Sequence, residues 1–200
     1  MQLVLREETE TQGEFLDYIS YNAVSGKWTV KDGGDVKEVK DVKVLCDIEN
    51  LQVGWLGWVP ANEPGKNRPD FHPYPQLDQP TDKPAEGYEI ATRLNMSFAK
   101  KSGLGVREWT CTSNIGKDAV QELLNAYMSD KDDNKGKVPV VHCTSTEAVK
   151  NYFGTTNYKP IFEITAWKDR PDELPNEIAA PTAAPAPTGE DVPVDDDEFV

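Results

Sequence analysis

The sequence is poor in the residue types that build most catalytic and metal sites. It contains only two histidines, His72 and His142, and three scattered cysteines, Cys46, Cys111 and Cys143. No pair of these residues has the short spacing of a zinc site. We find neither a Gly-x-Ser-x-Gly nucleophile motif nor a glycine-rich phosphate loop ending in Lys-Ser or Lys-Thr. We therefore expect no metal, no cofactor and no enzymatic activity.

Long apolar runs are missing as well. No stretch approaches the roughly 20 apolar residues that a membrane-spanning helix needs. Residues 1–10 lack the charged-then-apolar pattern of a secretory signal. An odd number of widely spaced cysteines is typical of free thiols in a reducing compartment. We expect a cytoplasmic protein without membrane contact, in which Cys46 and Cys111 are buried in strands.

Basic residues are absent from the end of the chain. Nine of the 35 acidic residues and none of the 21 basic ones lie from Pro171 onwards, so the net charge of −14 divides into −9 there and −5 in residues 1–170. Residues 179–188 are all Ala, Pro or Thr, a composition that cannot bury enough apolar surface to fold. The sequence therefore predicts a folded domain over residues 1–172 and a disordered Ala/Pro linker with an acidic tail over 173–200.

The tail ends in an unusual tip, in which Phe199 follows an acidic run and precedes the last residue, Val200. Acidic tails often serve only solubility. An exposed aromatic residue within a polar rim is more typical of an interaction site. We therefore expect the tip to bind partner proteins through Asp195, Asp196, Asp197, Glu198, Phe199 and Val200.

Alternation of apolar and polar residues dominates the rest of the chain. It predicts a hairpin over 18–23 and 27–30, and strands over 42–48, 53–59, 87–98, 106–112, 138–143 and 160–167. Pro139 suggests an edge strand. One helix is expected over 114–129, capped by Ser113 or Asn114, and a short second one over 145–153. Residues 60–84 contain seven prolines, and we expect them to form a long loop.

This order predicts a mainly β fold. A five-stranded oligonucleotide/oligosaccharide-binding barrel (OB-fold) has its helix between the third and fourth strands. The helix over 114–129 can hold that position if 53–59, 87–98 and 106–112 are the central strands. We expect an OB-fold-like antiparallel barrel with one main helix and extra hairpins, and a β-sandwich is the alternative.

Several aromatic residues have a cation close by in the sequence. Aromatic faces can stack on unpaired bases while Lys and Arg contact phosphates. On this basis the candidate nucleic-acid-binding residues are Lys27, Trp28, Trp55, Lys100, Lys101, Arg107, Trp109, Tyr158 and Lys159. The competing interpretation is that these aromatic residues belong to the core, because Trp and Tyr at strand spacing bury large areas.

With these features the chain resembles single-stranded-DNA-binding proteins of bacteria and their phages. The resemblance is carried by the acidic tip, and also by Val106-Arg107-Glu108-Trp109-Thr110 and by residues 157–164 with Trp167 and Arg170-Pro171, which are similar to phage-encoded members. Bacterial members usually end in Pro-Phe, whereas here Glu198 precedes Phe199 and Val200 follows it.

The resemblance implies a protein of the bacterial host cytoplasm that binds single-stranded DNA without sequence preference. It would protect DNA during phage replication, recombination or repair, and its tail would recruit replication and repair proteins. The alternative is an acidic protein–protein adaptor, DNA mimic or virion accessory protein without nucleic-acid binding. The sequence leaves open whether the chain forms homo-oligomers.

Overall fold

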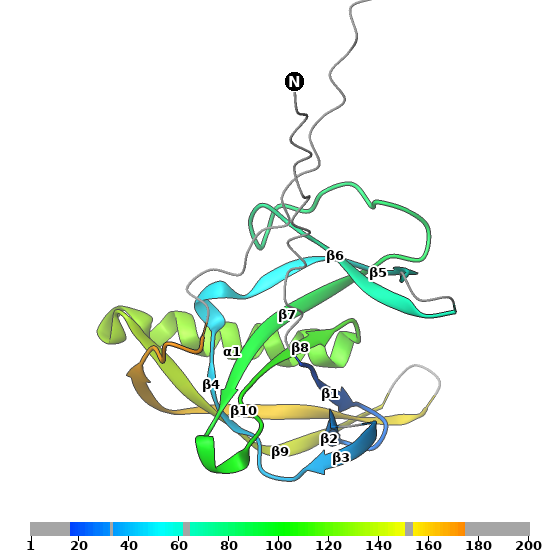
Figure 1. Ribbon diagram of the computed structural model, residues 1–200. Helices are drawn as coiled ribbons and strands as arrows, with labels where there is room; N and C mark the ends of the chain where they lie inside the picture. The colour runs from blue at the N-terminus through cyan, green and yellow to red at the C-terminus, as the bar shows by residue number, and fades with distance from the viewer. Residues whose placement is uncertain (1–16, 33, 62–64, 151–153, 175–200) are drawn as a thin grey trace, which may run out of the picture.

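Antiparallel strands make up most of the structure, a computed structural model that describes residues 17–32, 34–61, 65–150 and 154–174 (Figure 1). The strands are β1 (Ile19–Asn22), β2 (Lys27–Asp32), β3 (Asp35–Val39), β4 (Lys43–Cys46), β5 (Gln52–Pro60), β6 (Asn67–Pro73), β7 (Glu89–Phe98), β8 (Val106–Cys111), β9 (Lys137–Lys150) and β10 (Thr156–Asp169). One α-helix, α1 (Asn114–Asp130), and three short 3-10 helices, η1 (Ile48–Asn50), η2 (Lys100–Ser102) and η3 (Lys131–Asn134), complete the described elements.

The larger sheet is organised around β7, which has three neighbouring strands. β8 pairs along one side of β7. Along the other side, β5 pairs with residues 89–93 and β4 with residues 96–98, and η1 lies between β4 and β5 in the sequence. β9 and β10 extend the sheet beyond β4, and β6 extends it beyond β5. Within the described residues the two end strands, β10 and β6, do not pair, so the sheet stays open.

A smaller sheet of β1, β2 and β3 packs against the larger one. A bridge between Tyr18 and Glu108 links its first strand to β8, and the backbone N–H of Tyr158 donates to the carbonyl of Ala23 at 2.7 Å. Side chains of β2 fill the space between the sheets. The ring centroids of Trp28 and Trp109 lie 4.9 Å apart in an edge-to-face arrangement, a favourable geometry for two buried aromatic rings.

Helix α1 covers one end of the larger sheet. It begins after Ser113, whose hydroxyl accepts a hydrogen bond from the N–H of Gly116 and so satisfies a free donor of the first turn. Its buried residues include Val120, Leu123 and Tyr127, and the Tyr127 ring lies 5.6 Å from that of Trp167 on β10. In the described part of the chain, no helix combines the length and apolar character that a bilayer span requires.

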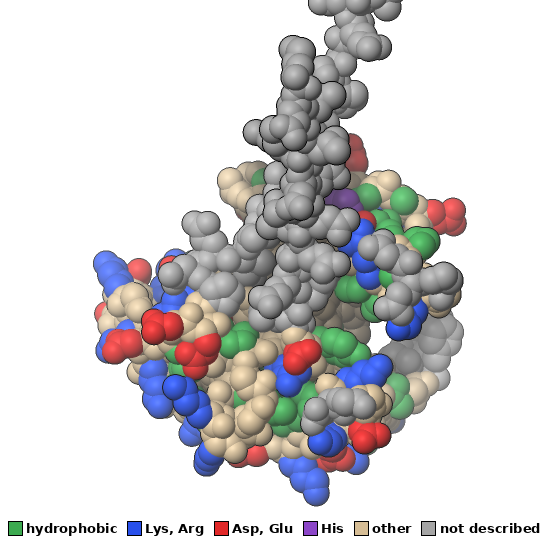
Figure 2. All heavy atoms as spheres, in the orientation of Figure 1, with side chains coloured by type: hydrophobic (Ala, Val, Ile, Leu, Met, Phe, Trp, Pro, Cys, Tyr) green, Lys and Arg blue, Asp and Glu red, His purple; other side chains and the backbone are tan. Residues whose placement is uncertain are grey.

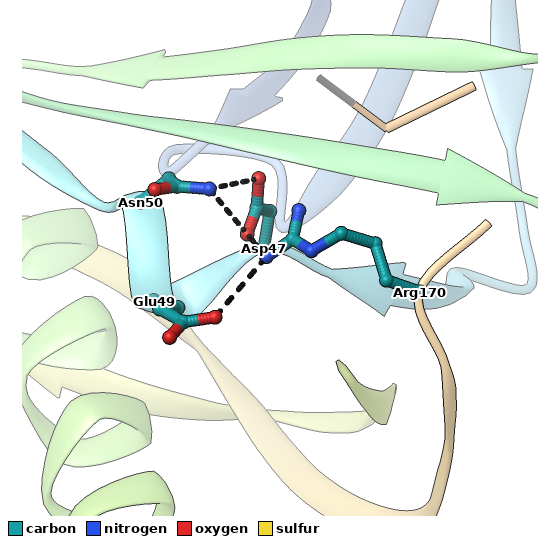
Figure 3. Close-up of polar contacts among 4 residues, drawn as sticks. All are labelled: Asp47, Glu49, Asn50 and Arg170. Carbon is teal, nitrogen blue, oxygen red and sulfur yellow. Dashed lines mark hydrogen bonds and ion pairs between the residues drawn. The ribbon is translucent and has the colours of Figure 1, made fainter. Parts of the chain in front are cut away.

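A polar network joins the end of β10 to the connection between β4 and β5 (Figure 3). The Asp47 carboxylate is 0% exposed, and Nη2 of Arg170 lies 2.6 Å from one of its oxygens. The Asn50 amide donates to both oxygens of the same carboxylate, at 3.2 and 3.0 Å. Glu49 lies 3.4 Å from Arg170 on the exposed side. Leu174, four residues after Arg170, is 1% exposed, so the chain is still packed against the domain at this point.

The predicted mainly β class is confirmed, as are the hairpin of β1 and β2, the helix with its Ser113 cap and the buried thiols of Cys46 and Cys111. Three local predictions are wrong. Residues 145–150 belong to strand β9 rather than to a helix. Pro139 lies in β9, which has β10 on one side and β4 on the other, so β9 is not an edge strand. The proline is tolerated because β4 pairs with β9 only over residues 140–142, so no β4 carbonyl needs an N–H at position 139. The loop expected over 60–84 contains β6.

Candidate nucleic-acid interface

Several aromatic residues lie on a projecting unit that we call the β5–β6 arm: residues 55–60 of β5, all of β6, and the loop 74–88 (Figure 1). β7 pairs with β5 only over Gln52–Leu56. From Gly57 to Pro60, β5 pairs with β6 alone, so this part of the hairpin extends beyond the central strand. The arm contains Trp55, Trp58, Phe71, Tyr74 and Tyr88.

One face of the hairpin is covered by the arm's own loop. The Trp55 indole N–H donates to the carbonyl of Thr81 at 3.0 Å, and the Tyr74 ring meets the Trp55 ring edge-on at 6.2 Å. The Tyr88 ring packs on Gly57, where an added Cβ would lie 2.6 Å from the ring. Glycine at position 57 therefore permits the close approach that holds the loop on the hairpin.

A hydrogen-bonded group fixes the loop further. The Tyr88 hydroxyl donates to Oδ2 of Asp70, and the same oxygen lies 2.8 Å from Nε2 of His72. Burial raises the pKa of the Asp70 carboxyl, but the hydrogen bonds from Tyr88 and His72 outweigh burial and leave this pKa below its ordinary value. The Asp70 hydrogen bond in turn raises the pKa of Tyr88. At neutral pH the group therefore contains an ionised Asp70 carboxylate and a neutral Tyr88 phenol.

The opposite face of the hairpin carries two aromatic residues, an exposed Trp58 and a half-buried Phe71. Leu56 pairs with Phe71 and Trp58 with Pro69, so these four side chains lie on one face. Trp58 is 65% exposed. An indole this exposed at the end of a hairpin is free to stack on a planar ligand.

Cations lie against two of the arm's rings. The Arg93 guanidinium carbon is 5.5 Å from the centroid of Phe71, and Lys83 Nζ is 5.9 Å from that of Trp55. Both distances fall within the range of cation–π attraction. Glu108 holds Arg93 in place, because its carboxylate accepts from Arg93 Nε at 2.6 Å. Figure 2 shows hydrophobic and basic side chains side by side at the upper right, over the arm.

The net charge of this region is close to zero. In residues 52–61 and 65–93 the basic residues are Lys66, Arg68, Lys83 and Arg93, and the acidic residues are Asp70, Asp78, Asp82, Glu86 and Glu89. Aromatic surface, rather than positive potential, is thus the distinguishing property of the arm.

Two of the aromatic residues predicted to stack on bases are core residues instead. Trp28 is 4% exposed and Trp109 is 1% exposed, and both contact Phe162 where the two sheets meet. Protein atoms cover their faces, so neither ring is available to a base in this structure. Trp55 does lie on the arm, half-buried beneath Lys83 and Tyr74.

The predicted cations are distributed over several elements and do not gather at the arm. Three of them contact carboxylates: Lys27 contacts Glu38 at 2.7 Å, Arg107 contacts Asp17 at 2.7 Å, and Lys159 contacts Glu122 and Glu147 at 2.8 and 3.0 Å. Arg107 is also buried, at 9% exposure.

Lys100 and Lys101 are exposed in η2, which follows the end of β7 opposite to the end that pairs with Trp55. Tyr158 is half-buried, and its carbonyl accepts a hydrogen bond from Tyr21 at 2.9 Å. The structure therefore brings none of the predicted cations together with Trp55.

The tail lies outside the described residues, except for Glu173 and Leu174. This applies to all of the predicted partner-binding residues, Asp195, Asp196, Asp197, Glu198, Phe199 and Val200.

Sequence reasoning missed most of the arm, namely Trp58, Phe71, Tyr74, Lys83 and Tyr88, and also missed Arg93 of β7. One signal was present: Gly54 and Gly57 alternate with tryptophans in β5, and such glycines mark a close approach by another part of the chain. The cation–π contact between Arg93 and Phe71 joins residues 22 positions apart, so their spacing in the sequence does not predict it.

No group of three or more His, Cys, Asp or Glu side chains among the described residues is arranged to hold a metal ion. Comparisons of the chain with protein-family models, with curated proteins and with solved structures found no match.

Proposed function

We propose that this protein binds single-stranded DNA without sequence preference through the β5–β6 arm, and that it protects unpaired strands during DNA replication, recombination or repair. The observation that carries the proposal is an exposed Trp58 on the same hairpin face as Phe71, a half-buried ring with Arg93 beside it. Every base has a face that can stack on such rings. Arg93 is bound to Glu108, so its contact with a neighbouring phosphate would have to compete with that ion pair.

The magnitude of stacking is sufficient for useful affinity. One base on Trp58 and one on Phe71 would together contribute about 2–6 kcal/mol. Because the arm carries almost no net charge, DNA would release few counterions on binding to it. The affinity should therefore depend only weakly on salt concentration. Duplex DNA offers no free base faces, so the arm should discriminate against it.

The order of elements supports an OB-fold-like assignment as part of this proposal. β5, β7 and β8 precede α1, and β9 and β10 follow it, as the helix position in that fold requires. The recruitment of replication and repair proteins by residues 195–200 also remains a proposal, which rests on the resemblance of the acidic tip.

A second candidate function has an observation of its own. Lys27, Arg107 and Lys159 are each in contact with carboxylates on different elements, so these cations form no continuous basic groove. This arrangement favours an acidic adaptor or DNA mimic that acts through protein contacts.

Titration of a fluorescently labelled oligo-dT distinguishes the two functions. The proposal predicts binding at low salt, and a loss of about 5-fold to 150-fold in affinity for Trp58→Ala or Phe71→Ala. Tyr18→Ala is a matched control, because Tyr18 is an exposed aromatic residue, at 53%, outside the arm. Failure of the unaltered protein to bind the oligonucleotide would reject the proposal and favour the adaptor.

A further inference from the structure

A concave site lies where the smaller sheet meets β9, and it has no residue in common with the arm. Its volume is about 260 Å³, and its walls come from residues 26–28, 38–40, 42 and 143–146. β2 and β3 supply one side of the cavity and β9 the other.

The path of β9 explains the cavity. β4 pairs with β9 up to His142, and the N–H of Cys143 then donates to the carbonyl of Val42 at 2.9 Å. In the pairing with β10, Cys143 opposes Phe162 and Ser145 opposes Ile161, so Thr144 is the extra residue of a β-bulge. Bulges redirect side chains and are frequent beside functional sites. Here the bulge places three consecutive exposed hydroxyl residues, 144–146, along one wall.

The opposite wall is positively charged. Lys27 and Lys40 both line the cavity, together with a single carboxylate, Glu38. Lys27 Nζ lies 2.7 Å from Glu38 Oε2. This hydrogen bond, together with the charges of Lys27 and Lys40, lowers the pKa of Glu38. Among the lining residues one positive charge is left over, beside the hydroxyl groups of Ser145 and Thr146, which can donate to an oxyanion. The Thr144 hydroxyl instead donates to Glu163 at 3.4 Å.

One of the lining residues carries a buried hydrogen-bond donor. Trp28 lines the cavity and is 4% exposed, and its indole N–H has no hydrogen-bond acceptor within the part of the chain that is described. Cys143 also lines the cavity, and its sulfur, at best a weak acceptor, makes no hydrogen bond with this N–H. A buried donor without a good acceptor is an unusual feature that calls for an explanation.

We propose that this cavity binds a phosphate group, which Lys27 and Lys40 would hold by charge and Ser145 and Thr146 by hydrogen bonds. Two sources share this chemistry, a small phosphate ester and a phosphate of a nucleic-acid strand. The site goes beyond the function proposed for the arm and does not depend on it.

The indole N–H resonance of Trp28 in the full chain, assigned with Trp28→Phe, provides the test. The protein is titrated with inorganic phosphate, with thymidine monophosphate and with oligo-dT that lacks terminal phosphates, at constant ionic strength. We expect a saturable shift with at least one of the three. A shift with the first two assigns the site to small phosphates, and a shift with the oligonucleotide alone assigns it to a strand.

Two lysine variants make the test specific. Lys40→Ala should weaken the binding by at least about tenfold, because a hydrogen bond to a charged group is lost. Lys100→Ala should leave it unchanged, since Lys100 is an exposed lysine in η2 that does not line the cavity. Absence of a saturable shift with all three ligands, or equal weakening by both variants, would overturn the proposal. Neither result bears on the arm, because Lys40 is not part of it.

Discussion

Replacing Arg170 by alanine should lower the free energy of unfolding substantially, because it leaves a buried carboxylate without its cation. Asp47 is 0% exposed and lies 2.6 Å from Arg170 Nη2. Breaking a buried ion pair by removing one partner typically costs about 3–5 kcal/mol. The Asn50 amide still donates to both carboxylate oxygens, at 3.2 and 3.0 Å, so we expect the lower end, about 3 kcal/mol.

Urea unfolding followed by tryptophan fluorescence measures this loss. Glu49→Gln is the matched control, because Glu49 is 68% exposed and lies 3.4 Å from the same guanidinium. An exposed pair of this kind contributes less than about 1 kcal/mol. If Arg170→Ala costs no more than Glu49→Gln, the buried pair does not hold the end of β10 against the β4–β5 connection, and the reasoning is wrong.

Three further predictions concern the core, the arm and the response to pH. Trp28→Ala and Trp109→Ala should each cost about 3–5 kcal/mol in urea unfolding, as expected for large core side chains; a loss below about 1 kcal/mol would show that the ring is not buried. Gly57→Ala should displace the Tyr88 ring and speed limited proteolysis within residues 74–88, and unchanged cleavage would contradict the packing. Burial and then the nearby Cys143 raise the pKa of Tyr21 from 10.0 to about 12. The unfolded chain loses this proton first, so stability should fall between about pH 10 and 12, and less so in Tyr21→Phe.

Much of the fold could be predicted because its signals are local. Alternation in residues 87–98 and 106–112 gave β7 and β8, and Ser113 marked the start of α1. β6 was missed because Pro69 and Pro73 argue against a strand, yet β6 lies at the edge of its sheet, where a missing N–H is tolerated. Residues 145–150 were read as a helix, although pairing with β10 makes them a strand.

The site was harder to predict, because burial depends on contacts between distant parts of the chain. Trp28 and Trp109 each have a cation nearby in the sequence, but they pack against one another between two sheets, 81 positions apart. Trp58 has no cation next to it in the sequence, yet it is 65% exposed. It lies beyond Leu56, where the pairing of β7 with β5 ends, so β7 does not flank it. A cation next to an aromatic residue in the sequence therefore says little about which ring is available to a ligand.

The most direct test of the arm is photochemical crosslinking of the full chain to an oligonucleotide that carries 5-iodo-deoxyuridine, followed by mapping of the crosslinked peptides. Stacking on the arm predicts crosslinks at Trp58 and Phe71, with weaker ones at Trp55, and their loss when unlabelled oligo-dT competes. Crosslinks confined to β9 and β10, or no crosslink at all in low salt, would contradict the account.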